Sequence, residues 1–272
     1  MDHKRRVGVC VAAACAAAML ASAPGASALP EVGRCAAQPG SGKYKNASCT
    51  EKAGKLVVEK AFEFLKGAGG GSRAFTLEDG GAAFEGANGT KIGCAGRSAA
   101  GEYREVNGAI KEVTNVVLRF STCFAPLITP GCTSEGAEGG EIATSPLKGR
   151  LGYISGKGTK TPVVGLELTP MAGKRTLFAK CKIDGLVTFD IGQGEGLGGD
   201  RVIATVGEVN AMATTNTLAL ARTEPGVQKP QSFEGIFRIA NLEWDTNGGP
   251  FERISVEADT TIENEQPLEI KA

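Results

Sequence analysis

The sequence predicts an all-β fold, an antiparallel β-sandwich or barrel-like sheets stapled by disulfides. Three observations carry this prediction. Short runs of alternating apolar and polar residues recur along the chain, and 39 glycines over its 272 residues separate them. Six cysteines lie outside a predicted signal peptide, and an even number in an exported chain favours disulfides over metal ligands. Short strands at regular spacing are typical of sandwiches and barrels.

The N-terminal 28 residues have the three parts of a secretory signal peptide. Lys4–Arg6 form a basic start, Val7–Ala21 an apolar run too short to span a membrane, and Ala26–Ala28 a small-x-small cleavage site. We therefore expect a secreted, extracellular product with no membrane association after cleavage. Residues 29–272 are predicted as a single all-β domain, or as two packed β subdomains divided near residues 192–199.

Cleavage at residue 28 also removes His3, the only histidine. A chain without imidazole has no Ser-His-Asp triad, Cys-His dyad or histidine-based metal site. Its 27 basic and 29 acidic residues are nearly balanced and interspersed. Nucleic acid and anionic membranes are therefore not expected partners.

The six remaining cysteines allow fifteen disulfide connectivities, and none of them has the C-x-x-C spacing of a zinc site. Cys35–Cys49 and Cys123–Cys132 are predicted because each closes a short loop containing glycine or proline. Cys94–Cys181 is then the remaining pair, and it would tie the two halves of the chain together.

Strands are predicted in order along the chain. The candidates are Arg73–Glu78, Thr90–Ala95, Gly101–Val106, Val163–Leu168, Thr176–Ile183, Leu186–Ile191, Arg201–Val206 and Thr217–Arg222. At the centre, Val116, Leu118 and Phe120 alternate with polar residues up to Cys123, and Glu141–Ile154 re-enters after a proline-containing loop. Lys55–Gly67 fits a helix nearly as well as a strand.

A hairpin near the C-terminus is the clearest local signal. Asn247–Pro250 forms the turn, after which Ile254, Val256 and Ala258 alternate with polar residues. Before the turn, the apolar positions Phe237, Ile239, Leu242 and Trp244 change parity, which predicts a bulge at Ala240 and Asn241 and places Trp244 in the core.

Four motifs in order, LPEVGRC, NGTKIGC, GCTSEGAEGGEIATSPLKGRLGYI and NGGPFE, resemble a large family of secreted, functionally uncharacterised proteins from soil actinobacteria. The resemblance covers nearly the whole mature chain. It implies export and an all-β fold, and it favours a strand at Lys55–Gly67. It implies no catalytic residue.

Several motifs invite a chemical interpretation. Ser145–Lys148 matches the S-x-x-K of penicillin-binding enzymes, but Gly149 and the flanking strands favour a turn. Gly192–Gly199 has the glycine content of a phosphate loop without its Lys-Ser/Thr, so a hairpin connection is favoured. Oxygens for calcium are available at Asp190, Glu195, Asp200, Asp245 and Asn247, without the spacing of a known calcium loop.

Paired carboxylates are the one catalytic chemistry that a histidine-free chain performs easily. The strand candidates are Glu141, Glu167, Glu243 and Asp245. The favoured function is nonetheless a non-catalytic binding or cell-envelope module with an unknown extracellular partner or glycan as its ligand. The alternative is a carboxylate-dependent secreted glycan hydrolase. No catalytic, cofactor-binding or metal-binding residue is assigned, and no cofactor is expected.

Overall fold

The computed structural model describes residues 30–56, 59–67, 74–78, 80–106, 108–125, 131–171, 178–184, 186–192, 201–237 and 242–272, and the structural statements below refer to these. The signal segment 1–28 and nearly all of the suggested division at 192–199 lie outside them. The described chain is β throughout, as the sequence predicts, and contains no helix long and apolar enough to cross a membrane.

Eighteen strands make up the fold. They are β1 (Glu31–Ala37), β2 (Phe62–Lys66), β3 (Ala74–Glu78), β4 (Ala82–Gly86), β5 (Lys91–Val106), β6 (Ala109–Phe124), β7 (Ile142–Ala143), β8 (Leu147–Ser155), β9 (Val163–Pro170), β10 (Ala179–Ile183), β11 (Val187–Gly192), β12 (Val202–Val206), β13 (Met212–Glu224), β14 (Val227–Lys229), β15 (Ser232–Phe233), β16 (Ile236–Phe237), β17 (Leu242–Thr246) and β18 (Glu252–Lys271).

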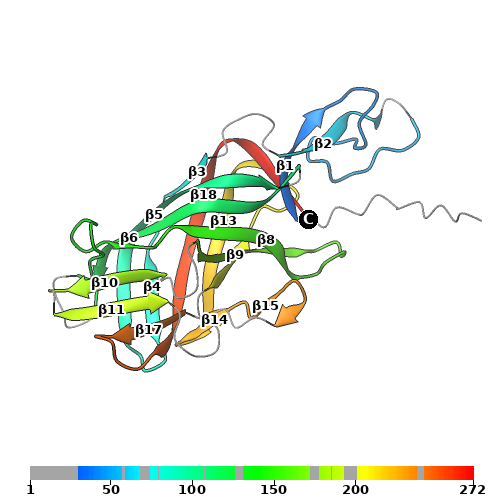
Figure 1. The fold of residues 1–272 in the computed structure, drawn as a ribbon. Coiled ribbons are helices and arrows are strands. Elements are labelled where there is room, and N and C mark those ends of the chain that lie inside the picture. The colour runs from blue at the N-terminus through cyan, green and yellow to red at the C-terminus, as the bar shows by residue number, and fades with distance from the viewer. Residues whose placement is uncertain are drawn as a thin grey trace, which may run out of the picture.

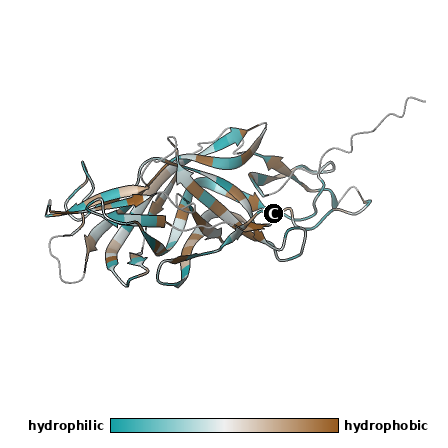
Figure 2. Ribbon diagram, turned by 60° about the horizontal axis from the view of Figure 1, so that its bottom comes forward, coloured by the Kyte–Doolittle hydropathy of each residue, from teal (hydrophilic) through white to brown (hydrophobic). Residues whose placement is uncertain are grey.

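Eight of these strands close into an antiparallel barrel. Its order is β18-β3-β5-β6-β8-β9-β12-β13, and pairing between β13 and β18 completes the ring. The alternation of apolar and polar residues along its strands turns one side chain in two toward the inside, and Figure 2 shows the resulting bands of hydrophobic and hydrophilic colour. The interior is packed: the cavity lined by Phe75, Tyr103, Leu166 and Ile262 has a volume of about 20 Å³. That is room for roughly one water molecule.

Below the barrel, a second set of strands extends the sheet from the long strands β5, β6 and β18. β4 fills the space between β5 and β18, and β17, β11 and β10 continue the sheet from the other side of β18 (Figure 1). An isolated bridge between Thr144 and Ala179 connects β10 back to the chain beside β6. One continuous apolar cluster runs through both parts, with Phe84, Phe120 and Trp244 fully buried in the lower one.

The strand predictions are largely confirmed. Each predicted run lies wholly or partly on a strand, but Thr90–Ala95 and Gly101–Val106 are two parts of the single strand β5. Val116, Leu118 and Phe120 are buried together on β6. In the ambiguous segment Lys55–Gly67, the part Phe62–Lys66 forms β2.

The C-terminal hairpin is also confirmed, with one correction. The turn has positive φ at Asn247 and Gly248, which suits its right-handed twist. Phe237, expected in the core, is instead 72% exposed, because it lies on the short separate hairpin β15–β16 and not on β17. Ile239 and the predicted bulge at Ala240 and Asn241 lie outside the described residues.

The structure contains three disulfides. Cys35–Cys49 is confirmed, but Cys123–Cys132 and Cys94–Cys181 are wrong: Cys94 is bonded to Cys123, and Cys132 to Cys181. Cys94 lies directly opposite Cys123 on the adjacent strands β5 and β6, with Cα atoms 3.9 Å apart.

The Cys132–Cys181 pair is explained in the same way. Thr133 and Lys182, the residues that follow these cysteines, exchange two backbone hydrogen bonds of 2.8 and 2.9 Å. Strand register therefore decides the connectivity, and loop length does not.

Strands β1 and β2 form a hairpin beside the C-terminus (Figure 1). β1 pairs with the last residues of β18 and, through Val32, with Ile110 of β6. Val32 thereby covers one end of the barrel, where it lines the small interior cavity.

Candidate functional site

The structure separates most of the motifs that the sequence singles out. Ser145 lies between β7 and β8, where its N–H donates to the Phe178 carbonyl, and Lys148 is an exposed residue of β8. Ser145 lies before the strand that contains Lys148, and no helical turn brings the two side chains together, so the nucleophile–lysine geometry of S-x-x-K is not formed.

The candidate calcium ligands that the structure describes form an ion pair and hydrogen bonds in turns. Asp190 pairs with Lys180 at 2.8 Å, Asp245 accepts a 2.6 Å hydrogen bond from Gly248 N, and Asn247 accepts one from Thr188 N. Glu195 and Asp200 lie outside the described residues, together with most of the Gly192–Gly199 run.

The four catalytic carboxylate candidates lie in three different parts of the fold. Glu141 pairs with Arg119 at 2.5 Å, Glu243 and Asp245 lie two residues apart on β17, and Glu167 lies on β9 in the barrel. Asp245 does lie opposite Asp190 of β11.

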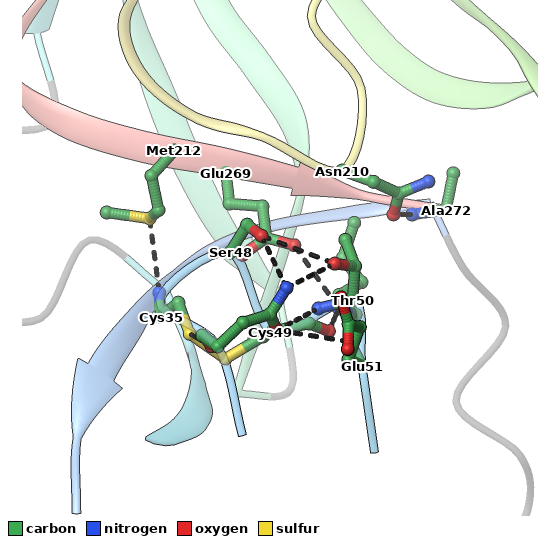
Figure 3. Close-up of polar contacts among 11 residues, drawn as sticks. Cys35, Ser48, Cys49, Thr50, Glu51, Asn210, Met212, Glu269 and Ala272 are labelled. Carbon is green, nitrogen blue, oxygen red and sulfur yellow. Dashed lines mark hydrogen bonds and ion pairs between the residues drawn. A yellow bond between two sulfur atoms is a disulfide. The ribbon is translucent and has the colours of Figure 1, made fainter. Parts of the chain in front are cut away.

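A polar cluster that the sequence does not indicate joins the N-terminal hairpin to the end of β18 (Figure 3). Glu269 is fully buried beside the Cys35–Cys49 disulfide, and the Lys271 ammonium lies 3.2 Å from its Oε1. The same ammonium donates to the Cys49 carbonyl and lies over the Tyr44 ring, 4.6 Å from its centre.

Within the described chain, Cys35, Cys49 and Glu269 are the one group of three potential metal ligands. Their two sulfur atoms are bonded to each other, so no thiolate is available to a metal. The Cys35 N–H also donates to the Met212 thioether at 3.2 Å, and Figure 3 shows this contact. We interpret the cluster as the anchor of the N-terminal hairpin.

Burial raises the pKa of Glu269, and Lys271 opposes this effect. The unfolded carboxyl has a pKa of about 4.3, so between that pH and the higher folded pKa the folded state holds more protons. The resulting contribution to stability is fully present below the unfolded pKa and is lost as the pH rises through the folded pKa. Tyr44, whose own pKa is raised chiefly by burial, stays neutral throughout this range.

We expect Glu269→Gln to remove this pH dependence. Urea unfolding from about pH 4 to 7 should show the wild type losing stability relative to the variant as the pH rises. Glu265→Gln, an exposed carboxylate on the same strand, is the matched control and should follow the wild type. Parallel wild-type and Glu269→Gln curves would contradict the assignment.

A concave site with a largely charged lining lies on the outer wall of the barrel. It is a groove of about 330 Å³, here called the charged groove, and it is lined by Arg104, Glu112, Lys148, Gly149, Arg150, Glu167 and Thr169. Four neighbouring strands, β5, β6, β8 and β9, supply these residues, because charged residues occupy outward positions of each strand.

Strand register arranges the charges as a ladder of alternating sign. Arg104 lies opposite Glu112, Glu112 opposite Arg150, and Arg150 opposite Glu167. The corresponding ion pairs are Arg104–Glu112 at 3.6 Å and Arg150–Glu167 at 2.8 Å. Arg201, just before β12, adds a 3.5 Å contact to Glu167. Cross-strand pairs of opposite charge stabilise a sheet modestly.

Phe233 of β15 packs against one side of this ladder of charges. The Phe233 ring packs on the wall where Gly152 leaves room, since a Cβ at Gly152 would lie 2.4 Å from the ring. The Arg150 guanidinium lies over the same ring, 5.0 Å from its centre. This stacking fixes the orientation of Arg150 in the groove.

Comparison of the chain with protein-family models, with curated proteins and with solved structures finds no match. Function is therefore inferred from the geometry of the charged groove, and the resemblance to actinobacterial secreted proteins stays a prediction.

The sequence analysis singles out two of the groove residues. Glu167 is one of its catalytic carboxylate candidates, and Lys148 belongs to its S-x-x-K match. For Arg104, Arg150 and Arg201, the available signal was a charge on a predicted strand. Glu112 lies outside every strand that the sequence predicts. Which charges meet depends on strand register, and that is set by long-range pairing.

Proposed function

We propose that the protein is an exported, non-catalytic binding module that holds an acidic polysaccharide in the charged groove. The observation that carries this proposal is the local excess of positive charge in a chain whose total charge is zero. Four cations, Arg104, Lys148, Arg150 and Arg201, surround two carboxylates, Glu112 and Glu167.

The donors of the groove suit an anionic ligand. Arg104 and Arg150 have about half or more of their side chains exposed, and Arg150 uses only its Nε toward Glu167. A guanidinium carries five donors in a planar fork that matches carboxylate, sulfate and phosphate groups. No aromatic ring is among the described residues that line the groove, and nucleic-acid grooves normally supply such rings for base stacking. A polysaccharide is therefore the favoured polyanion.

The alternative, a glycan hydrolase, has less support. A hydrolase needs one carboxyl group that donates a proton and a second that faces water or the sugar. Both carboxylate oxygens of Glu167 contact arginines, and Glu112 pairs with Arg104. The two carboxylates of the groove therefore orient arginine side chains and do not form a catalytic pair.

Export is part of the proposal. Three disulfides are compatible with an oxidising compartment, and they agree with the signal peptide predicted at residues 1–28. A protein outside the cell would meet acidic polysaccharides directly.

Binding to polygalacturonate, dextran sulfate and polyphosphate tests the proposal and distinguishes carboxylate, sulfate and phosphate as the preferred group. We expect the oxidised protein to bind at least one of them at low salt and to lose affinity as salt is raised. The double variant Lys148→Glu/Arg104→Glu should bind at least tenfold more weakly. Lys160→Glu, an exposed lysine at the far end of the β8–β9 hairpin, should bind like the wild type.

Two outcomes would overturn this function. One is the absence of binding to all three polyanions at low salt. The other is an equal loss of affinity in Lys160→Glu and in the groove variant. Release of new reducing ends from polygalacturonate that Glu167→Gln abolishes would establish the hydrolase instead.

A further inference from the structure

Phe124, the last residue of β6, occupies an unusual position on the surface. It lies opposite Gly93 of β5, and a Cβ at Gly93 would be 3.4 Å from the ring Cζ and within 3.8 Å of both Cε atoms. The ring therefore lies over the glycine, while the Phe124 residue is 51% exposed. An aromatic ring that covers a glycine stabilises the strand pair, and it also presents an apolar surface to solvent.

Phe124 lines two open depressions. The first, of about 700 Å³, has backbone of Gly131, Gly139 and Gly140 in its wall. The second, of about 580 Å³, is lined by Gly80, Gly81 and Gly93. Because Phe124 lines both, the two depressions together form a shallow trough around its ring, with six glycines among the lining residues.

The charges around the trough are balanced, whereas cations are in excess in the charged groove. Lys182 and Asp184 line the first depression, and Glu257 and Asp259 line the second. Glu257 is paired with Arg222 at 2.9 Å, and Arg97 donates to the Gly81 carbonyl in the wall of the second depression. A balanced set of charges gives a polyanion no net attraction and offers hydrogen-bonding groups to hydroxyls. The charge pattern therefore fits a neutral, hydroxyl-rich ligand.

The trough is also rigid. Cys94 and Cys123, which form a disulfide, directly adjoin Gly93 and Phe124, and the second disulfide, Cys132–Cys181, adjoins Gly131 and Lys182. Thr122, in the wall of the first depression, has φ +52°. This left-handed conformation is costly for a β-branched residue and is held by the surrounding structure. A preformed site loses little entropy when it binds.

We propose that the Phe124 trough is a second binding site, which takes the uncharged pyranose rings of a neutral glycan. A pyranose ring has an apolar C–H face that packs on an aromatic ring and hydroxyl groups at its edge. Phe124 supplies the stacking surface, and Lys182, Asp184 and Asp259 lie where they can hydrogen-bond the hydroxyls. The site is independent of the charged groove, from which it differs in both charge and chemistry.

Titration of the oxidised protein with cellohexaose and with laminarihexaose, followed by backbone amide NMR, tests this proposal. We expect shifts at Gly93, Phe124, Gly131 and Lys182 with at least one of the two sugars. Phe124→Ala should bind at least tenfold more weakly, and Phe124→Trp should bind at least as well as the wild type.

Phe237→Ala is the matched control, because it also removes an exposed phenylalanine and should leave binding unchanged. The Lys148→Glu/Arg104→Glu variant should keep its affinity for the neutral hexasaccharide, so failure at one site is distinguishable from failure at the other.

The proposal is overturned if neither hexasaccharide produces shifts at these residues, or if folded Phe124→Ala binds like the wild type. Amide spectra of each variant identify any loss of fold. If sedimentation velocity shows a dimer that depends on Phe124 and no sugar binds, the occupant of the trough is a second copy of the chain and not a glycan.

Discussion

Replacing both Cys132 and Cys181 by alanine is expected to destabilise the protein by about 4 kcal/mol. The two residues are 49 positions apart, and the chain-entropy model gives about this value for a closed loop of that length. This bond joins the segment before β7 to β10, which otherwise belongs to the β10–β11–β17 extension. Urea unfolding monitored by far-UV circular dichroism measures the loss.

Cys35→Ala/Cys49→Ala provides the comparison. Its cysteines are 14 positions apart, for which the same model gives about 3 kcal/mol. This pair holds a peripheral hairpin and not the core, so we expect the barrel to keep its cooperative transition. A Cys132→Ala/Cys181→Ala variant as stable as the wild type would show that this bond does not hold the extension in place.

Replacing Trp244 by alanine is expected to cost about 3–5 kcal/mol, the usual range for a fully buried large aromatic residue. Trp244 is 1% exposed, its ring centre is 5.1 Å from that of Phe189, and it packs where β17 meets β18. Phenylalanine keeps an aromatic ring but is smaller than tryptophan, so Trp244→Phe should lose a smaller part of the stability.

Unfolding of these variants is followed by circular dichroism, because the substitution removes the only tryptophan. Phe251→Ala, which truncates an exposed phenylalanine in the loop between β17 and β18, should change the stability by no more than about 0.5 kcal/mol. A loss below about 1 kcal/mol for Trp244→Ala would mean that the lower core collapses around the missing ring.

The two proposed sites are formed on the same pair of strands. Each occupies outward positions on the same long strands β5 and β6, the charged groove near Arg104 and Glu112 and the trough at Gly93 and Phe124. The packed interior leaves no room for a ligand among the described residues. We therefore propose binding at the outer surface and not in the interior.

The candidate sites show what strand pairing adds to a list of residues. Glu167 was visible in the sequence as a strand carboxylate, but its neutralisation by Arg150 and Arg201 depends on the pairing of β8 with β9 and on the position of the segment before β12. The sequence predicts that Phe124 lies in the connection after Cys123, whereas the structure extends β6 to Phe124 and places its ring over Gly93.

The sequence by itself determined the β-structure, because the alternation at Val116–Phe120 and the turn residues Asn247–Gly248 act through local backbone preferences. The core position of Trp244 followed from the same alternation. Tertiary structure alone decided the partners of Cys94, Cys123, Cys132 and Cys181, the exposure of Phe237 and the meeting of charges in the groove. Each of these depends on which strand a residue joins and which residue lies opposite it, and the local pattern carries no information about that register.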